Sequence, residues 1–150
     1  MEIVKLTREY KDEVFSMMRE FYDSPALIHK SSDDVLNRDI EDCISDNPFI
    51  EGYVFLDDSG VVGYSMVAKS YTTEYGGLCI WVEDIYFKKA ARGKGYGTSY
   101  FKFLEEEYPD AVRFKLEVES ENEGAIATYY KNGYDISQYS LMTKEIDKDE

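Results

Sequence analysis

The chain is poor in the residues that build metal, redox and disulfide sites. Its 150 residues include one histidine and two cysteines. Cys43 and Cys79 lie far apart, each inside an apolar pattern, and neither belongs to a Cys-x-x-Cys pair or a Cys/His ligand spacing. We therefore expect both to be reduced core residues and expect no metal site. The single histidine, His29, lies between two predicted helices and is expected in an exposed turn.

Basic residues and long apolar runs are also scarce. Seventeen Lys and Arg against thirty-one Asp and Glu give a formal net charge of −14, which argues against nucleic acid or an anionic membrane as the main partner and favours cationic partners. No apolar run approaches the roughly 18 residues of a membrane-spanning helix, and the amino terminus lacks a signal-peptide pattern. We expect a cytoplasmic protein with a single domain over residues 1–150, because a chain of this length can bury one core.

The hydrophobic period changes repeatedly along the chain. Apolar residues spaced by three and four predict amphipathic helices over residues 8–23 and 32–44. A period of two and a β-branched or aromatic composition predict strands over residues 2–6, 50–56, 61–69, 78–87 and 113–119. Further helices are predicted before Pro109 and over residues 122–132, with Gly133 after the second, followed by terminal strands around Tyr134 and residues 139–146. This order predicts a mixed sheet with helices on its faces.

The basic residues that are present gather around one glycine-rich segment. Five of them lie within KKAARGKGYGTSYFKFL, residues 88–104, which contains no Asp or Glu. Its alternating glycines stand where a predicted strand leads into a helix, so backbone N–H groups can converge on an anion while the helix adds a positive dipole end. This pattern predicts a polyphosphate site in an otherwise acidic protein.

Two other phosphate motifs fit this segment less well. A Walker loop ends in Gly-Lys followed by Ser or Thr, whereas Gly97-Thr98 lacks the lysine. A dinucleotide fingerprint needs a third glycine where Thr98 stands, although Glu117 and Glu119 lie about where that fold places its ribose-binding acid. The dinucleotide alternative stays open, but little sequence follows the motif from which to build the usual parallel sheet.

Two segments together resemble the GNAT superfamily of acyl-CoA-dependent N-acyltransferases. WVEDIYFKKAARGKGYGTSYFKFLEE matches the family's Gln/Arg-x-x-Gly-x-Gly/Ala signature at Arg92, Gly95 and Gly97. NEGAIATYYKNGY is similar to its second signature at Asn122, Ala125, Ile126, Tyr129, Lys131, Gly133 and Tyr134. The resemblance implies an α/β fold with a central, mostly antiparallel twisted sheet of six to seven strands and about four flanking helices. The strand motif is closest to the polyamine and small-amine acetyltransferase branch.

The resemblance also implies how acetyl-CoA, as co-substrate, is bound. Strand residues Ile85 and Phe87 would offer backbone groups to the pantetheine arm, and the Asn122 side chain would contact the same arm. Backbone amides would bind the pyrophosphate, with Arg92 nearby, at Gly93, Lys94, Gly95, Tyr96, Gly97 and Thr98.

Amine acetylation needs a base, because an alkylammonium with a pKa near 10 has no lone pair at neutral pH. Glu83, in VEDIYF, resembles the strand acid that serves as general base in the polyamine branch, and Asp84 competes for this role. Simple strand alternation predicts that Glu83 shares a face with Trp81, Ile85 and Phe87.

The departing thiolate needs a proton, and Tyr129 occupies the family's tyrosine position for this acid. Tyr130 points about 100° away around a helix and is the weaker candidate. Neither cysteine has a histidine near it in sequence, so we expect direct attack in a ternary complex and no covalent acyl-enzyme.

The acceptor is expected to be a small cationic primary amine, such as a polyamine or an amino sugar. Acidic clusters at residues 20–23, 33–34 and 41–42 and at Glu74 can attract ammonium groups, although such clusters are also common on solvated helix faces. Two alternatives stay open: a non-catalytic module that binds or senses acyl-CoA, and a protein or peptide N-acetyltransferase. The resemblance also allows a homodimer.

Overall fold

Five strands and four α-helices make up most of the protein in a computed structural model that describes residues 1–148. The strands are β1 (Glu2–Lys5), β2 (Ile50–Asp57), β3 (Gly60–Thr72), β4 (Gly77–Phe87) and β5 (Ala111–Leu116). The helices are α1 (Lys11–Asp23), α2 (Asp33–Ile44), α3 (Tyr96–Glu107) and α4 (Glu123–Lys131), with short 3-10 helices at Arg8–Tyr10 and Lys89–Ala91. No helix in this part of the chain is long and apolar enough to cross a membrane.

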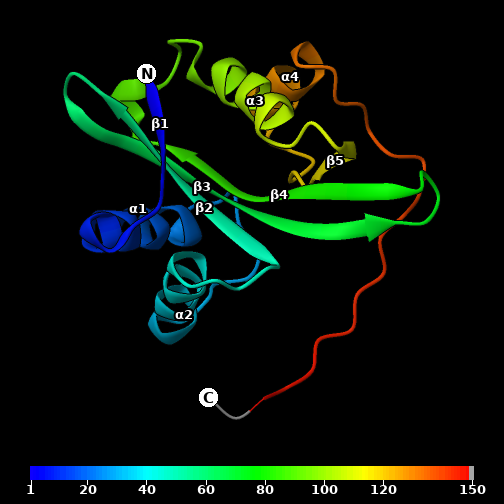
Figure 1. Ribbon diagram of the computed structural model, residues 1–150, viewed down its shortest axis with the longest axis horizontal. Helices are drawn as coiled ribbons and strands as arrows, with labels where there is room; N and C mark the ends of the chain where they lie inside the picture. The colour runs from blue at the N-terminus through cyan, green and yellow to red at the C-terminus, as the bar shows by residue number, and fades with distance from the viewer. Residues whose placement is uncertain (149–150) are drawn as a thin grey trace.

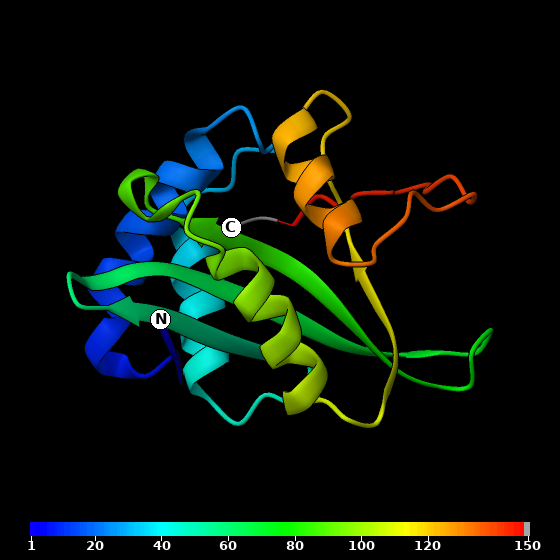
Figure 2. The same cartoon turned by 90° about the horizontal axis from the view of Figure 1, so that it is seen from above.

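The strands form one mixed sheet in the order β1-β2-β3-β4-β5. Neighbours from β1 to β4 run antiparallel, and β5 runs parallel to β4. Helices α1 and α2 cover one face of the sheet, and α3 and α4 lie over the other (Figures 1 and 2). The α/β fold with helices on both faces, which the sequence pattern predicts, is therefore confirmed.

Local sequence signals fix several element boundaries. Ser32 caps α2, because its Oγ accepts the Val35 N–H at 3.3 Å. Gly60 in the turn between β2 and β3 and Gly133 after α4 both have positive φ, at 109° and 90°, a conformation that favours glycine. His29 lies exposed between α1 and α2, as predicted.

Each face of the sheet carries its own hydrophobic cluster. On one face, buried residues of α1 and α2 such as Met18 and Ile40 pack against the β3 side chains Tyr64 and Met66. On the other, α3 contributes Tyr100, Phe101 and Leu104, which pack against Tyr53, Phe55, Val67, Ile80 and Val82 of the central strands. Cys43 and Cys79 are both buried and unpaired, as predicted.

The two predicted terminal strands are wrong. No strand occurs after β5 in the described residues, so the sheet has five strands there instead of six to seven. Residues 135–148 run beyond α4 as an extended trace without helix or strand (Figures 1 and 2). Their β-favouring composition is typical of a strand, but a strand also needs a hydrogen-bonding neighbour. No strand of the described residues pairs with this segment.

Candidate active site

A β-bulge interrupts β4 at Glu83. Val82 pairs with Val67 of β3 and Asp84 pairs with the preceding Met66, so Glu83 has no partner on β3. A bulge bends the strand and redirects the side chains that follow it. Accordingly Val82 packs in the same cluster as Ile85 and Phe87, on the α3 face. The prediction that Glu83 shares the face of Ile85 and Phe87 is therefore wrong, because alternation does not continue across a bulge.

Buried hydrogen bonds hold the bulge from both sides of the sheet. The Tyr100 hydroxyl donates to Ser65 Oγ at 2.6 Å, and Ser65 Oγ donates to the Asp84 carbonyl at 2.7 Å. The Asp84 carboxylate accepts the hydroxyls of Tyr22 at 2.9 Å and Tyr64 at 2.7 Å. A fully connected buried network of this kind makes the local backbone rigid. Sequence reasoning missed it because the donors come from three separate elements.

The network distinguishes the two candidate general bases, Glu83 and Asp84. Asp84 is 4% exposed and both of its carboxylate oxygens accept hydrogen bonds, so it has no free oxygen to offer a substrate. Glu83 is exposed, and no hydrogen bond or ion pair occupies its carboxylate in the described structure. Asp84 therefore stabilises the bulge, and Glu83 remains the candidate base whose carboxylate a bound molecule could reach.

Neighbouring carboxylates raise the pKa of Glu83 and of Asp39. Partial desolvation, Asp84 and Glu117 raise the pKa of Glu83. Burial raises the pKa of Asp39, on α2, to about 6, and the charges of Asp84, Asp42 and Glu83 add to this shift while Arg38 opposes it. Both shifts indicate a local negative potential that a bound cation would relieve.

Strands β4 and β5 separate directly beyond the bulge. Their pairing ends where Val82 meets Leu116, so the β5-facing edge of β4 has no strand partner after Val82 in the described chain. Ile85 and Phe87 lie in this segment, as the predicted cofactor contacts require. The Phe87 carbonyl accepts Arg92 Nε at 2.9 Å, and the Arg92 guanidinium lies 5.5 Å from the Tyr86 ring centroid. Arg92 thus connects the end of β4 to the glycine-rich segment.

The glycine-rich segment has the conformation that anion binding requires. Gly93 and Gly95 have φ of 76° and 78°, and an added Cβ at either position would meet no atom within 4 Å. The space beside their backbone is therefore open to a ligand. Tyr96, Gly97 and Thr98 form the first turn of α3 and are not part of the loop, so their N–H groups belong to a helix N-terminus. Gly97 also lies next to α4, because an added Cβ would be 3.9 Å from Thr128 Cγ2.

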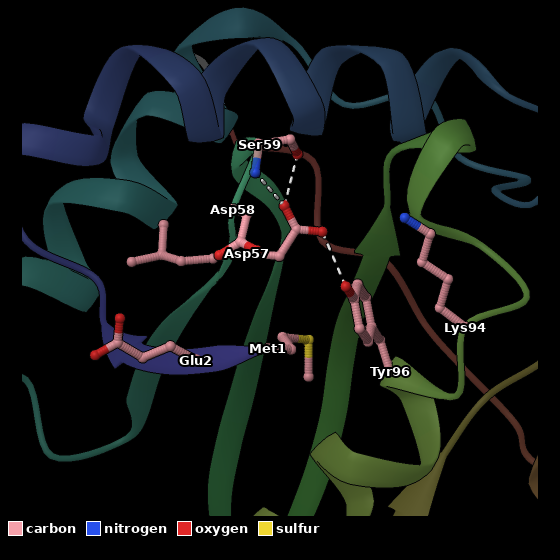
Figure 3. A pocket seen from close by; sticks show the side chains of 8 residues that line it. Met1, Glu2, Asp57, Asp58, Ser59, Lys94 and Tyr96 are labelled. Carbon is pink, nitrogen blue, oxygen red and sulfur yellow. Dashed lines mark hydrogen bonds between the residues drawn. The ribbon is translucent and has the colours of Figure 1, made fainter.

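A side-chain hydrogen bond from the turn between β2 and β3 braces the glycine-rich segment (Figure 3). The Tyr96 hydroxyl donates to Asp57 Oδ2 at 2.9 Å, while Asp57 Oδ1 accepts the backbone N–H and the hydroxyl of Ser59. Hydrogen bonds from Ser59 and Tyr96 lower the pKa of Asp57 to about 2. A surface hollow beside this contact is lined by Glu2, Asp57 and Lys94 among others, and Glu83 and Tyr129 are not part of it. The brace was not predicted, because Asp57 reads in the sequence simply as a turn residue.

Helix α4 presents the remaining predicted residues. The Asn122 Oδ1 accepts the Ala125 N–H at 3.3 Å, so this side chain caps the helix, and its amide nitrogen makes no hydrogen bond within the described residues. Tyr129 is half-buried, packs edge-on against Phe101 at 5.8 Å between centroids, and has its pKa raised by burial. Tyr130 is 50% exposed. The Asn132 side chain donates to Thr98 Oγ1 at 3.2 Å and joins α4 to α3.

The sequence matches the acetyltransferase (GNAT) family over residues 11–134. The chain belongs to the GNAT family. Solved structures support the same fold. A possible acetyltransferase from Clostridium difficile 630 superposes with a TM-score of 0.82 at 20% identity, over 98% of both chains. Comparison of the sequence with curated proteins gave no match.

Two further solved structures with this fold carry specific names. The ribosomal-protein-alanine N-acetyltransferase from Brucella melitensis biovar Abortus 2308 has a TM-score of 0.77 at 16% identity, covering 96% of this chain and 98% of its own. AAC(6')-Iy, in complex with a bisubstrate analog, has a TM-score of 0.78 at 11% identity, covering 97% and 98%. At these identities the likeness shows the fold alone.

The structure brings the two predicted signature segments together where α4 packs beside the first turn of α3. The bulge at Glu83, the open edge that follows it and the glycine segment are consecutive along the chain. Within residues 1–148, no three His, Cys, Asp or Glu side chains are arranged to hold a metal ion.

Proposed function

We propose that the protein transfers an acetyl group from acetyl-CoA to a primary amine of a small cationic acceptor. The observation that carries the proposal is the bulge at Glu83, which places an exposed, unpaired carboxylate beside the open edge of β4 and upstream of the glycine segment. This arrangement combines a base with an extended ligand path. It supports the small-amine branch that the strand motif VEDIYF suggests.

The chain's backbone suits the two ends of acetyl-CoA. Amides of Gly93, Gly95 and the first turn of α3 would hold the diphosphate, and Lys94 adds positive charge there. The β5-facing edge of residues 83–87, which has no strand partner in the described chain, would hydrogen-bond the amide groups of the pantetheine arm as a neighbouring strand does. When bound, the co-substrate supplies an electrophilic thioester carbonyl and a thiol leaving group.

Glu83 would accept the proton that the acceptor amine must lose. A raised pKa makes its carboxylate a better base. The hydrogen bonds from Tyr22 and Tyr64 to Asp84 fix the backbone next to Glu83 and so fix the position from which it acts.

Tyr129 would return a proton to the sulfur of the leaving thiolate. Burial raises the pKa of its phenol, so the proton is present at neutral pH, and no hydrogen bond from the described residues occupies the hydroxyl. Replacing Tyr129 by Phe should lower kcat by about 10- to 100-fold with little change in coenzyme A affinity, since one proton transfer is lost. Tyr130→Phe is the matched control, and equal activity of both variants would remove Tyr129 from the mechanism.

The carboxylates around Glu83 support a cationic acceptor. Asp39, Asp84 and Glu117 face a shared negative potential, which would attract an ammonium group and orient a second one in a diamine or amino sugar. The net charge of −14 adds long-range attraction for the same class of molecule.

An acceptor panel with acetyl-CoA tests the proposal. Free thiol release should be fastest with di- and polyamines or amino sugars, should be slower with neutral amines, and should weaken as salt is raised because screening reduces electrostatic attraction. Turnover limited to peptide amino termini or protein lysines would reject the acceptor class. Calorimetric binding of acetyl-CoA without thiol release from any acceptor would instead support a non-catalytic acyl-CoA-binding module.

A further inference from the structure

The last part of β4 turns backbone groups toward the side from which β5 has separated. Phe87 pairs with Gly63 of β3. The N–H of the next residue, Lys88, donates to the Val62 carbonyl at 2.8 Å. In antiparallel pairing this makes Phe87 a member of a non-hydrogen-bonded pair, so its own N–H and C=O point away from β3. The register is regular from Phe87 back to Ile85, so both residues present an N–H and a C=O to the open edge.

One of these edge groups is already occupied. Arg92 Nε donates to the Phe87 carbonyl at 2.9 Å, and no other hydrogen bond reaches the edge groups of Ile85 or Phe87 within the described residues. The Arg92 guanidinium also lies 5.5 Å from the Tyr86 ring centroid. A charged side chain from the glycine-rich segment therefore sits on a carbonyl that the pantetheine arm would use.

The contact with Tyr86 shows which side of the sheet the guanidinium occupies. The Tyr86 ring belongs to the hydrophobic cluster on the α1 face. Gly95 precedes α3 as its N-cap residue, and α3 lies over the other face (Figures 1 and 2). No hydrogen bond or ion pair joins the Arg92 side chain to residues 93–98 in the described structure. This arrangement therefore keeps the guanidinium off the predicted diphosphate site.

We propose that Arg92 selects coenzyme A thioesters over shorter pantetheine thioesters by exchanging the Phe87 carbonyl for the diphosphate. A pantetheine arm that bonds the Phe87 carbonyl must displace the arginine from it. A donor that carries the diphosphate replaces the lost hydrogen bond, because a guanidinium binds phosphate oxygens through parallel, charge-assisted N–H bonds. A donor that ends at pantetheine offers no replacement. The inference rests on the proposed function, since it takes the co-substrate to bind along β4.

Arg92 can serve both positions because of its place in the chain. It directly precedes Gly93, whose φ is 76°, and its side chain is exposed. Rotation about its side-chain bonds therefore moves the guanidinium without disturbing the buried part of the sheet. Lys88 and Lys89 add positive charge to the same segment, but neither side chain donates to the edge groups of β4 in the described structure.

The exchange would separate two classes of acyl donor. Acyl groups carried on coenzyme A bring the diphosphate, whereas acyl groups carried on pantetheine do not. Specificity is a difference between two affinities, so it can arise from a penalty on one ligand as well as from a gain for the other. Arg92 would contribute both, since it blocks the Phe87 carbonyl against the shorter donor and binds the phosphates of the longer one.

The binding of coenzyme A and of pantetheine to Arg92→Ala tests the exchange. Titration followed by nuclear magnetic resonance gives both dissociation constants, including weak ones. We expect coenzyme A to bind roughly 3- to 10-fold more weakly and pantetheine roughly 3- to 10-fold more tightly than to the unsubstituted protein, as expected when one hydrogen bond is lost or one competitor is removed. Lys89→Ala is the control, because it removes a nearby charge and leaves the contact with Phe87 intact, so its pantetheine affinity should not change.

The sign of the pantetheine effect decides the inference. A purely structural role of Arg92 would weaken both ligands together, and the melting temperature shows whether the fold is intact. Weaker or unchanged binding of pantetheine to Arg92→Ala, with coenzyme A still bound by the unsubstituted protein, would overturn the exchange and leave the proposed function standing. If the unsubstituted protein does not bind coenzyme A, the proposed function fails and the exchange fails with it.

Discussion

The chain up to Leu104 and the chain after it are built differently, although both contribute to the candidate site. Within residues 1–148, every buried residue belongs to the first region, which packs two hydrophobic clusters against the central strands. The second region consists of β5, α4 and residues 135–148, and it packs against the first through partly exposed contacts such as Tyr129 against Phe101. Stability is therefore concentrated in the first region.

The difference matters for function because the proposed roles are split between the regions. Glu83 and the glycine segment lie in the rigid region, where buried hydrogen bonds fix the bulge. Asn122 and Tyr129 lie in the loosely packed region, where β5 no longer pairs with β4 beyond Val82. Four experiments test this division, from the largest expected effect to the smallest.

The Glu83→Gln substitution tests whether the first region supplies the general base. We expect kcat to fall by about 10²–10⁴-fold, since general base catalysis contributes that much, while coenzyme A affinity and the melting temperature stay unchanged. In the unsubstituted protein, activity should decline as pH falls through the raised pKa of Glu83, because its carboxylate must be ionised to accept a proton. Glu106→Gln, on exposed α3 surface, is the control. Wild-type turnover in Glu83→Gln would place the base elsewhere.

A pair of leucine truncations measures the contrast in packing directly. Leu104→Ala, at a fully buried position, should lower the free energy of unfolding by about 2–5 kcal/mol. Leu141→Ala, at a position that is 61% exposed, should change the free energy of unfolding by no more than about 0.5 kcal/mol. Urea unfolding gives both values. Equal losses would show that Leu141 is packed as tightly as Leu104 and would break the comparison.

Tyr96→Phe tests whether the turn between β2 and β3 braces the phosphate segment. Loss of the hydrogen bond to Asp57 should weaken coenzyme A binding by roughly 3- to 10-fold, as expected when a single hydrogen bond is removed. Calorimetry measures this change. Tyr71→Phe, at a 70% exposed position on β3, is the control. An unaltered dissociation constant for Tyr96→Phe would mean that the loop holds its shape without the brace.

The Asp39→Asn substitution tests whether repulsion among the carboxylates near Glu83 lowers the stability of the fold at neutral pH. The pKa of Asp39 is raised to about 6 in the folded protein from 3.8, its ordinary value. The contribution of the protonated carboxyl to the stability of the fold is therefore fully present below pH 3.8 and is lost as pH rises through 6. The substitution should therefore stabilise the protein at pH 7.5, on the order of 1 kcal/mol or ~2–4 °C in melting temperature after allowing for solvent screening. At pH 4 the two proteins should melt together. Asp110→Asn, in an exposed turn, serves as control, and a shift of the same size at both pH values would contradict the electrostatic explanation.

Much of the fold could be predicted from local patterns, because period and capping are properties of neighbouring residues. The helices, the five strands and the positive-φ residue after α4 all follow from such signals. The two terminal strands were wrong because composition shows that a segment can be extended and does not show what it pairs with. The prediction of the sheet face on which Glu83 lies was wrong for a related reason, because a bulge depends on the register of the neighbouring strand.

The sequence alone determined the order of elements, the prediction of a phosphate site at the glycine segment and the GNAT resemblance. These are carried by residues close together in the chain, whose spacing sets their geometry. Only the tertiary structure decided that Asp84 is held by Tyr22 and Tyr64 while Glu83 is left free, that Asp57 supports Tyr96, and that β5 keeps an open edge. Such contacts join residues far apart in the chain, and only the packed fold brings their side chains within hydrogen-bonding distance.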